Sequence, residues 1–146
     1  VGRRQQHENF SALTQLDFAP SNENDEAGLV VFMDYKAHYD LSIRNIAGKR
    51  TLILSYNLGA INHLEKQIPI GNGQVTLKVE GSGSYYVFSY TQGNNVFEVL
   101  GKVEAKYLST ETNGGFTGVY IGLFATGNGQ NSTANADFDW FDYQHR

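Results

Sequence analysis

The sequence contains no cysteine and only two prolines among its 146 residues. The absence of cysteine excludes disulfide bridges and thiolate metal sites, and it leaves the redox compartment of the protein undecided. Sixteen glycines beside so few prolines are typical of a fold with many tight turns rather than of a disordered chain. A single domain spanning residues 1–146 is expected, because a chain of this length buries roughly 70% of its unfolded surface in one core.

Positive charge and long apolar runs are also scarce. The chain has 11 Lys and Arg against 15 Asp and Glu, and its net charge of −4 argues against a nucleic-acid partner. No apolar run approaches the ~20 residues that a membrane-spanning helix needs, so no membrane partner is expected. The sequence starts at Val1, without a methionine and without a signal peptide, and we expect a fragment. Its localisation is left unknown, with the cytoplasm of a bacterium as the working expectation.

Hydrophobic residues recur at every second position through most of the chain, which is the period of β-strands. Residues 10–18, 38–44, 50–56 and 74–80 alternate in this way, whereas 27–33 (AGLVVFM) is almost entirely apolar and indicates a buried strand. Further strands are expected at 85–90, 96–100, 119–125 and 134–143. Residues 61–70 are a weaker strand or an irregular segment, and a short helix is an alternative at 102–107. The pattern predicts an all-β fold, an antiparallel sandwich of two sheets.

A polar loop with two glycines and one aromatic ring precedes the strand that lacks charge. Gly114 and Gly115 tolerate backbone angles that other residues resist, so the loop can bend sharply. The ring of Phe116 directly after this bend either fills the end of the core or is exposed and contacts something outside the domain. Both faces of the strand at 119–125 (VYIGLFA) are apolar, which favours a central position in a stack of two sheets.

Paired carboxylates are the first chemistry to test, because glycoside hydrolysis needs two of them across a substrate. Asp137 and Asp139 lie two positions apart in an expected strand, which puts them on one face roughly 6–7 Å apart. The favoured interpretation is a solvent-side pair, opposite Ala136, Phe138 and Trp140, which pack inward. A structural calcium ion is the alternative, since carboxylates on neighbouring strands suit a hard cation. No catalytic pair and no other cofactor are expected.

The remaining candidate sites carry weaker signals. Residues 22–26 (NENDE) lack the glycine spacing of a calcium-binding loop, so a solvated loop is favoured. The four histidines, at positions 7, 38, 63 and 145, have no metal-ligand spacing. Aromatic rings can stack on sugars, and the candidates for such a platform are Tyr85, Tyr86, Phe88, Tyr90 and Trp140. Their spacing favours instead rings that fill the layers of a sandwich.

Four stretches of the sequence together resemble one protein family. They are residues 2–6 (GRRQQ), 23–29 (ENDEAGL), 109–122 (STETNGGFTGVYIG) and 136–143 (ADFDWFDY). In this order they are similar to the C-terminal domain of β-xylosidases of glycoside hydrolase family 43, including bifunctional β-xylosidase/α-L-arabinofuranosidases. The resemblance covers the chain from end to end, and the long stretch at 109–122 is its most specific part.

The resemblance implies a jelly-roll sandwich similar to concanavalin A and laminin G domains, following a five-bladed β-propeller that is absent from these residues. In that family the propeller carries the catalytic carboxylates, so no catalytic residue is expected here. The sandwich lends the propeller a substrate-pocket loop with a phenylalanine, which matches residues 114–117: Gly114, Gly115, Phe116 and Thr117. Arg3, Arg4 and Gln5 match the stretch after the interdomain connection.

Two hypotheses of different class follow. In the first, the chain is a non-catalytic accessory domain that packs on the propeller of the same polypeptide and helps to bind xylo-oligosaccharides in a composite pocket. In the second, it is an autonomous carbohydrate-binding module or lectin-like domain for xylo-oligosaccharides. The first is favoured because the sharpest motif is a loop with one ring rather than a broad aromatic face. The parent is expected to be a xylan 1,4-β-xylosidase; α-L-arabinofuranosidase activity and homo-oligomerisation are left open.

Overall fold

The computed structural model describes residues 2–4, 9–18, 25–34, 37–71, 73–82, 85–93, 96–104, 120–126 and 136–145. At residues 2–4, 33–34, 136–137, 139–141 and 145 it describes the backbone alone. These residues form 11 β-strands and no helix, which confirms the all-β prediction. This part of the chain therefore offers no helix that is long and apolar enough to cross a membrane.

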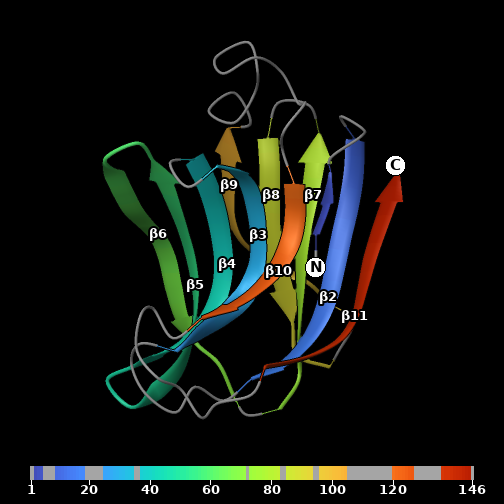
Figure 1. Ribbon diagram of the computed structural model, residues 1–146. Helices are drawn as coiled ribbons and strands as arrows, with labels where there is room; N and C mark the ends of the chain where they lie inside the picture. Colours follow the sequence, from blue (N-terminus) through green and yellow to red (C-terminus); the bar gives the residue numbers. More distant parts are fainter. Residues whose placement is uncertain are drawn as a thin grey trace.

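The strands form two antiparallel sheets that pack face to face (Figure 1). The six-stranded sheet contains, in spatial order, β1 (Gly2–Arg4), β10 (Tyr120–Thr126), β3 (Glu26–Asp34), β4 (Ala37–Ile46), β5 (Lys49–Leu58) and β6 (Ile61–Pro69). The five-stranded sheet contains β11 (Ala136–His145), β2 (Asn9–Phe18), β7 (Val75–Ser82), β8 (Tyr85–Thr91) and β9 (Glu98–Glu104). The predicted two-sheet sandwich is confirmed.

Alternate residues of both sheets fill the space between them, as the period of the sequence requires. In β4 the inward residues Tyr39, Leu41 and Ile43 are fully buried, as predicted. The other buried apolar side chains of this core come from β2, β3, β5, β7, β8, β9 and β10. They are Phe10, Ala12, Leu16, Phe18, Ala27, Leu29, Val31, Leu52, Leu54, Val75, Leu77, Val79, Tyr86, Phe88, Leu100, Val103 and Ile121.

Two of the uncertain segments are resolved in favour of strands. Residues 61–69 form the edge strand β6, which pairs with β5 along its length, so the irregular alternative is wrong there. Residues 102–104 continue β9, so the helix alternative is wrong for these three residues, and 105–107 lie outside the described ranges. The β4–β5 hairpin turns at Ala47 and Gly48, which have φ angles of 53° and 80°. Positive φ at both central residues is what a two-residue hairpin of type I′ requires.

The strand β10 differs from its prediction. It lies second from the edge, between β3 and the three-residue β1, rather than at the centre of its sheet. Ile121 is fully buried in the core, as expected for one apolar face. On the opposite face Tyr120 is 41% exposed and Phe124 is partly exposed. The second apolar face of this strand is therefore on the outside of the sandwich.

Polar contacts join the two sheets at both ends of the sandwich. At one end the hydroxyl of Tyr39 in β4 donates to the carbonyl oxygen of Glu104 at the end of β9, over 2.8 Å. The Tyr39 ring also meets Tyr86 and Phe88 of β8 edge-on, with centroids 5.9 and 6.4 Å away. Tyr39 thus connects the sheets through both its ring and its hydroxyl.

At the other end, the guanidinium of Arg50 in β5 reaches across to the second sheet. It donates to the carbonyl oxygens of Phe18 and Gly73, each over 2.8 Å, and also to that of Gly71. Burial lowers the pKa of Arg50, and the negative charge of Asp17 opposes this shift. Phe18 ends β2, and Gly71 and Gly73 lie in the connection from β6 in one sheet to β7 in the other. The side chain of Arg50 therefore holds this connection against the end of β2.

We predict that Tyr39→Phe destabilises the domain by about 1–2 kcal/mol, because the carbonyl of Glu104 loses its donor while the ring contacts remain. Urea denaturation monitored by tyrosine fluorescence or circular dichroism measures this change. Tyr90→Phe is the matched control, since the hydroxyl of Tyr90 donates to the Glu98 carboxylate in an exposed bond of 2.9 Å. An equal loss in both variants would contradict the special role of Tyr39.

Candidate functional site

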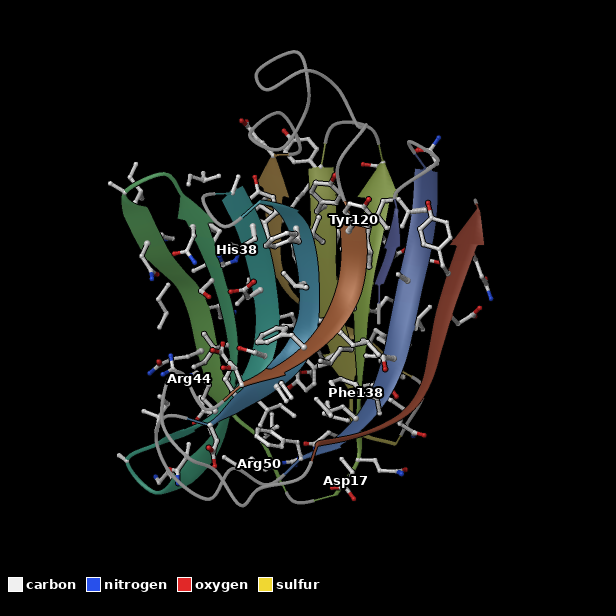
Figure 2. All side chains as sticks on the ribbon, viewed as in Figure 1. Asp17, His38, Arg44, Arg50, Tyr120 and Phe138 are labelled. Atoms are coloured by element: carbon white, nitrogen blue, oxygen red, sulfur yellow. The ribbon has the colours of Figure 1, made fainter. Side chains whose placement is uncertain are left out.

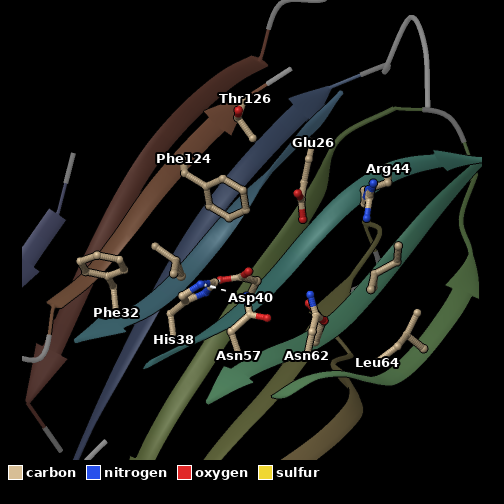
Figure 3. Close-up of a pocket in the computed structure, with 13 residues that line it drawn as sticks. Glu26, Phe32, His38, Asp40, Arg44, Asn57, Asn62, Leu64, Phe124 and Thr126 are labelled. Atoms are coloured by element: carbon tan, nitrogen blue, oxygen red, sulfur yellow. Dashed lines mark hydrogen bonds and ion pairs between the residues drawn. The ribbon is translucent and has the colours of Figure 1, made fainter. Parts of the chain in front are cut away.

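A groove with a volume of about 680 Å³ lies on the outer face of the six-stranded sheet (Figure 3). We call it the outer groove. Strands β10, β3, β4, β5 and β6 of this sheet contribute to it. Its lining residues are Glu26, Val30, Phe32, His38, Asp40, Arg44, Ile53, Ser55, Asn57, Asn62, Leu64, Phe124 and Thr126. These residues point away from the core because the neighbouring positions in each strand point into it.

A linear hydrogen-bonded set of three side chains crosses the groove. The Nδ1 atom of His38 lies 2.8 Å from Oδ1 of Asp40, and the Nδ2 atom of Asn57 lies 2.9 Å from Nε2 of His38. The side chains of His38 and Asp40 are only 18% and 14% exposed. An amide N–H donates to Nε2, so this nitrogen acts as an acceptor and Nδ1 carries the proton that is given to Asp40. Both ring nitrogens of His38 are thus used within the sheet.

A carboxylate and a cation lie beside this set. The hydroxyl of Ser42 donates to Oε2 of Glu26 over 2.6 Å, which connects β4 to β3. Arg44 is the register partner of Glu26 across the same two strands, so opposite charges face each other on the sheet. Figure 3 shows the Glu26 and Arg44 side chains near the same end of the groove. Ile53, at 3% exposure, is more deeply buried than the other lining residues.

Aromatic rings form one flank of the groove. Phe124 projects from β10 and Phe32 from β3, and the Phe32 ring lies 6.1 Å from the imidazole of His38 (Figure 3). The register partner of Phe124 in β3 is Gly28, which has no side chain to cover the ring. Glycine is required there, because a Cβ atom at Gly28 would come within 2.1 Å of the carbonyl oxygen of Leu41. The groove therefore combines partly exposed rings with fixed hydrogen-bonding groups.

The residues expected at the interdomain contact and the substrate-pocket loop fall mostly outside the described ranges. Gly114, Gly115, Phe116 and Thr117 lie there, as does Gln5, so their predicted roles stay predictions. The backbone of β1, with Arg3 and Arg4, pairs with β10, and Arg4 is the register partner of Tyr120.

The predicted carboxylate pair lies on an irregular strand. Asp137 pairs with Asp17 of β2, but the register of β11 shifts between Phe138 and Trp140, with Asp139 at the shift. This irregularity interrupts the alternation from which a shared face for Asp137 and Asp139 was expected. Their side chains lie outside the described part of the molecule. A calcium ion held by Asp137 and Asp139 therefore stays a prediction.

The same shift changes the alternation that was expected along β11. Phe138 packs against the core as predicted, and so does Tyr143, although the two are an odd number of positions apart. Trp140 is paired in register with Gln15, which lies on the side of β2 opposite its fully buried residues. The predicted inward alternation thus fails beyond Phe138, because the extra residue at the irregularity reverses the parity of the strand.

The aromatic-platform alternative for β8 is wrong for its two central rings. Tyr86 and Phe88 are 1% and 0% exposed and belong to the core, as the favoured interpretation held. Tyr90 packs partly against the core. Burial, and then its bond to Glu98, raises the pKa of Tyr90. Tyr85 lies under the ammonium of Lys102, 4.2 Å from its ring centroid.

The acidic segment at 22–26 is not simply a solvated loop. Asp25 is 1% exposed, and Glu26 begins β3 with its carboxylate bonded to Ser42. The expectation of a solvated loop is wrong for these two residues, because the strand starts earlier than its apolar residues indicated. No cluster of three or more His, Cys, Asp or Glu able to hold a metal occurs in the described ranges.

Sequence reasoning missed the outer groove. The signal was present in β4, where every even position from 38 to 44 is polar: His38, Asp40, Ser42 and Arg44. Polar residues on one strand face are commonly solvated, and the alternation alone gives them no partners. Their contacts with Glu26 and Asn57 depend on the register of β3 and β5, which the sequence pattern did not supply.

Comparisons with known proteins place the chain in one family of C-terminal domains. Residues 1–144 match the family model of the β-xylosidase C-terminal concanavalin A-like domain. The non-reducing end α-L-arabinofuranosidase BoGH43B of Bacteroides ovatus is 40% identical over 146 residues, covering 99% of this chain and 27% of that protein. The xylosidase/arabinosidase 43B of Humicola insolens is 30% identical over 159 residues, covering 99% of this chain and 29% of that protein.

Solved structures agree with these matches. The Bacteroides ovatus xyloglucan PUL GH43B superimposes with a TM-score of 0.90 at 40% identity, covering 99% of this chain and 29% of that one. The GH43 BlXynB protein from Bacillus licheniformis gives a TM-score of 0.89 at 26% identity, with the same coverage of 99% and 29%. The chain spans less than a third of the length of these relatives.

We predict that His38 is held as its Nδ1–H tautomer, because Asp40 accepts at Nδ1 while Asn57 donates to Nε2. Long-range ¹H–¹⁵N correlation spectra, recorded where the imidazole is neutral, distinguish the two tautomers. His63, whose Nε2 lies 3.1 Å from Oε2 of Glu65, is the internal control and should show the Nε2–H form. Asp40→Ala should increase the Nε2–H form of His38; an Nε2–H signal for His38 in the unmodified protein would refute the assignment.

Proposed function

The chain belongs to the family of β-xylosidase C-terminal concanavalin A-like domains, and we propose that it is the non-catalytic accessory domain of a xylan-degrading β-xylosidase. In this proposal it packs on the catalytic β-propeller of the same polypeptide. It lends the substrate-pocket loop at 114–117, with Phe116, to a composite pocket for xylo-oligosaccharides. The much greater length of the relatives supports a second domain in the polypeptide, and their names include both xylosidase and arabinosidase.

The pairing of β1 with β10 is the observation that carries this proposal. It sets the expected interdomain residues Arg3 and Arg4 one strand spacing, about 4.8 Å, from the strand that begins four residues after Phe116. The end of β9 and the start of β10 also lie at the same end of the sandwich (Figure 1). The start of β10 therefore lies beside the N-terminal strand, which favours one shared contact region with a preceding domain.

The role proposed for Phe116 is positional. A ring that closes part of a sugar pocket excludes water and restrains the substrate, which helps catalysis without any proton transfer by this domain. The catalytic acid and base are assigned to the propeller. Tyr39 contributes indirectly, because its bond to the carbonyl oxygen of Glu104 fixes the last residue of β9 before the segment that holds Phe116.

We predict that Phe116→Ala lowers kcat/KM of the complete enzyme on an aryl β-xyloside about 10-fold, equivalent to ~1.4 kcal/mol of lost transition-state binding. The melting temperature of the isolated 146-residue chain should barely change, because no core cavity forms. Tyr85→Ala is the matched control and should keep kcat/KM unchanged, since the Tyr85 ring lies on the five-stranded sheet under the ammonium of Lys102. Destabilisation of the isolated chain by the ~3–5 kcal/mol typical of a buried phenylalanine would identify Phe116 as a core residue instead.

We predict further that the isolated chain does not hydrolyse aryl β-xylosides. The proposal assigns the catalytic acid and base to another domain. No sequence motif in this chain marks a residue for either role. The measurement is release of the aryl group by the purified chain over hours. Turnover that persists through purification and is lost in Asp137→Asn or Asp139→Asn would overturn the non-catalytic assignment.

A further inference from the structure

The outer groove has the extent of a polymer site rather than of a site for one small molecule. It crosses five strands, from β10 to β6, and four inter-strand spacings of about 4.8 Å give a width of about 19 Å. This is several times the length of a single pyranose ring.

The chemistry of the groove suits a carbohydrate. A sugar presents hydroxyl groups, which both donate and accept hydrogen bonds, around a ring with an apolar face. The groove offers carboxylate, imidazole, amide and guanidinium groups beside the partly exposed ring of Phe124. Asn57 and Asn62 point into it from adjacent strands (Figure 3). The ring of Phe124 and the amides of Asn57 and Asn62 therefore provide both kinds of contact.

The hydrogen-bonding groups are also fixed before a ligand arrives. Asp40 and Asn57 hold His38, and Ser42 holds Glu26, at distances between 2.6 and 2.9 Å. All five side chains are on strands rather than on loops. Side chains that are already ordered lose little conformational entropy on binding, which makes weak polar contacts with sugar hydroxyls effective.

The charge of the groove selects among carbohydrates. Glu26 and Asp40 bring two negative charges and Arg44 one positive charge, and His38 is neutral in the hydrogen-bonding arrangement described above. The resulting excess of one negative charge disfavours uronic acids, phosphates and other anions. Neutral pentose or hexose oligosaccharides fit this balance.

The outer face of the opposite sheet lacks a comparable site among the described residues. Its charged and aromatic groups interact with one another: the Lys78 ammonium lies 3.4 Å from Glu80 and 4.5 Å from the ring centroid of Phe97. The ring of Tyr85 is covered by Lys102. We propose that the outer groove is a second, non-catalytic carbohydrate site for neutral oligosaccharides, separate from the pocket that Phe116 helps to form. The choice of xylo-oligosaccharides as the ligand rests on the proposed function.

Calorimetric titration of the 146-residue chain with xylotetraose and xylohexaose tests the proposal. We expect binding that tightens with chain length, because the longer sugar spans more of the groove. Phe124→Ala should weaken it about 10-fold, corresponding to ~1.4 kcal/mol, and Asn57→Ala should weaken it as well. Tyr85→Ala, which removes a ring from the opposite sheet, should leave the affinity unchanged. Melting curves of all variants confirm that each remains folded.

Phe116→Ala separates this proposal from the function proposed above, because it should leave the titration of the isolated chain unchanged. Absence of binding to xylo-oligosaccharides and to cello-oligosaccharides at millimolar concentrations would overturn the carbohydrate site. Equal loss of affinity in Phe124→Ala and Tyr85→Ala, or tighter binding of an oligogalacturonate, would also overturn it. If Phe124→Ala lowers kcat/KM of the complete enzyme as much as Phe116→Ala, the groove belongs to the interdomain contact and the proposal fails.

Discussion

The hydrogen bond from the Tyr39 hydroxyl to the carbonyl oxygen of Glu104 joins the two sheets at one end of the sandwich. The same side chain sits among Tyr56, Tyr86 and Phe88 in the core. Because successive residues of a strand point to opposite faces, an inward Tyr39 fixes its neighbours outward, in the groove. These neighbours are His38, which is labelled in Figure 2, and Asp40. A constraint on core packing thus orients the groups that line the outer surface.

The inward faces could be predicted from the sequence, because burial imposes a simple period. Leu41, Ile43, Leu52 and Leu54 each lie where the alternation puts them, and each is fully buried. The turn at Gly48 could be predicted too, because a short hairpin between two alternating runs favours a residue that accepts positive φ. The turn depends on neighbouring residues in the sequence, and the burial of a strand residue depends only on the face of the strand to which it belongs.

The groove could not be predicted in this way, because its contacts join residues far apart in the sequence. Glu26 and Ser42 meet only through the register of β3 with β4, and His38 and Asn57 only through that of β4 with β5. A one-residue slip in either pairing would separate them. The register of β11 was missed for a related reason, since a single irregular residue reverses every later register position of that strand.

The pairing of strands from opposite ends of the sequence has a consequence for biosynthesis. Gly2 pairs with Gly122 and Phe10 with His145, so each sheet contains a contact that spans more than 100 residues. Such non-local contacts slow folding, because a long chain must be ordered before they form. Among the described strands β1 pairs only with β10, so on the ribosome this pairing waits until β10 has emerged, whereas β2 can already pair with β7. The N-terminal strand is therefore expected to be among the last parts of the domain to pair into its sheet.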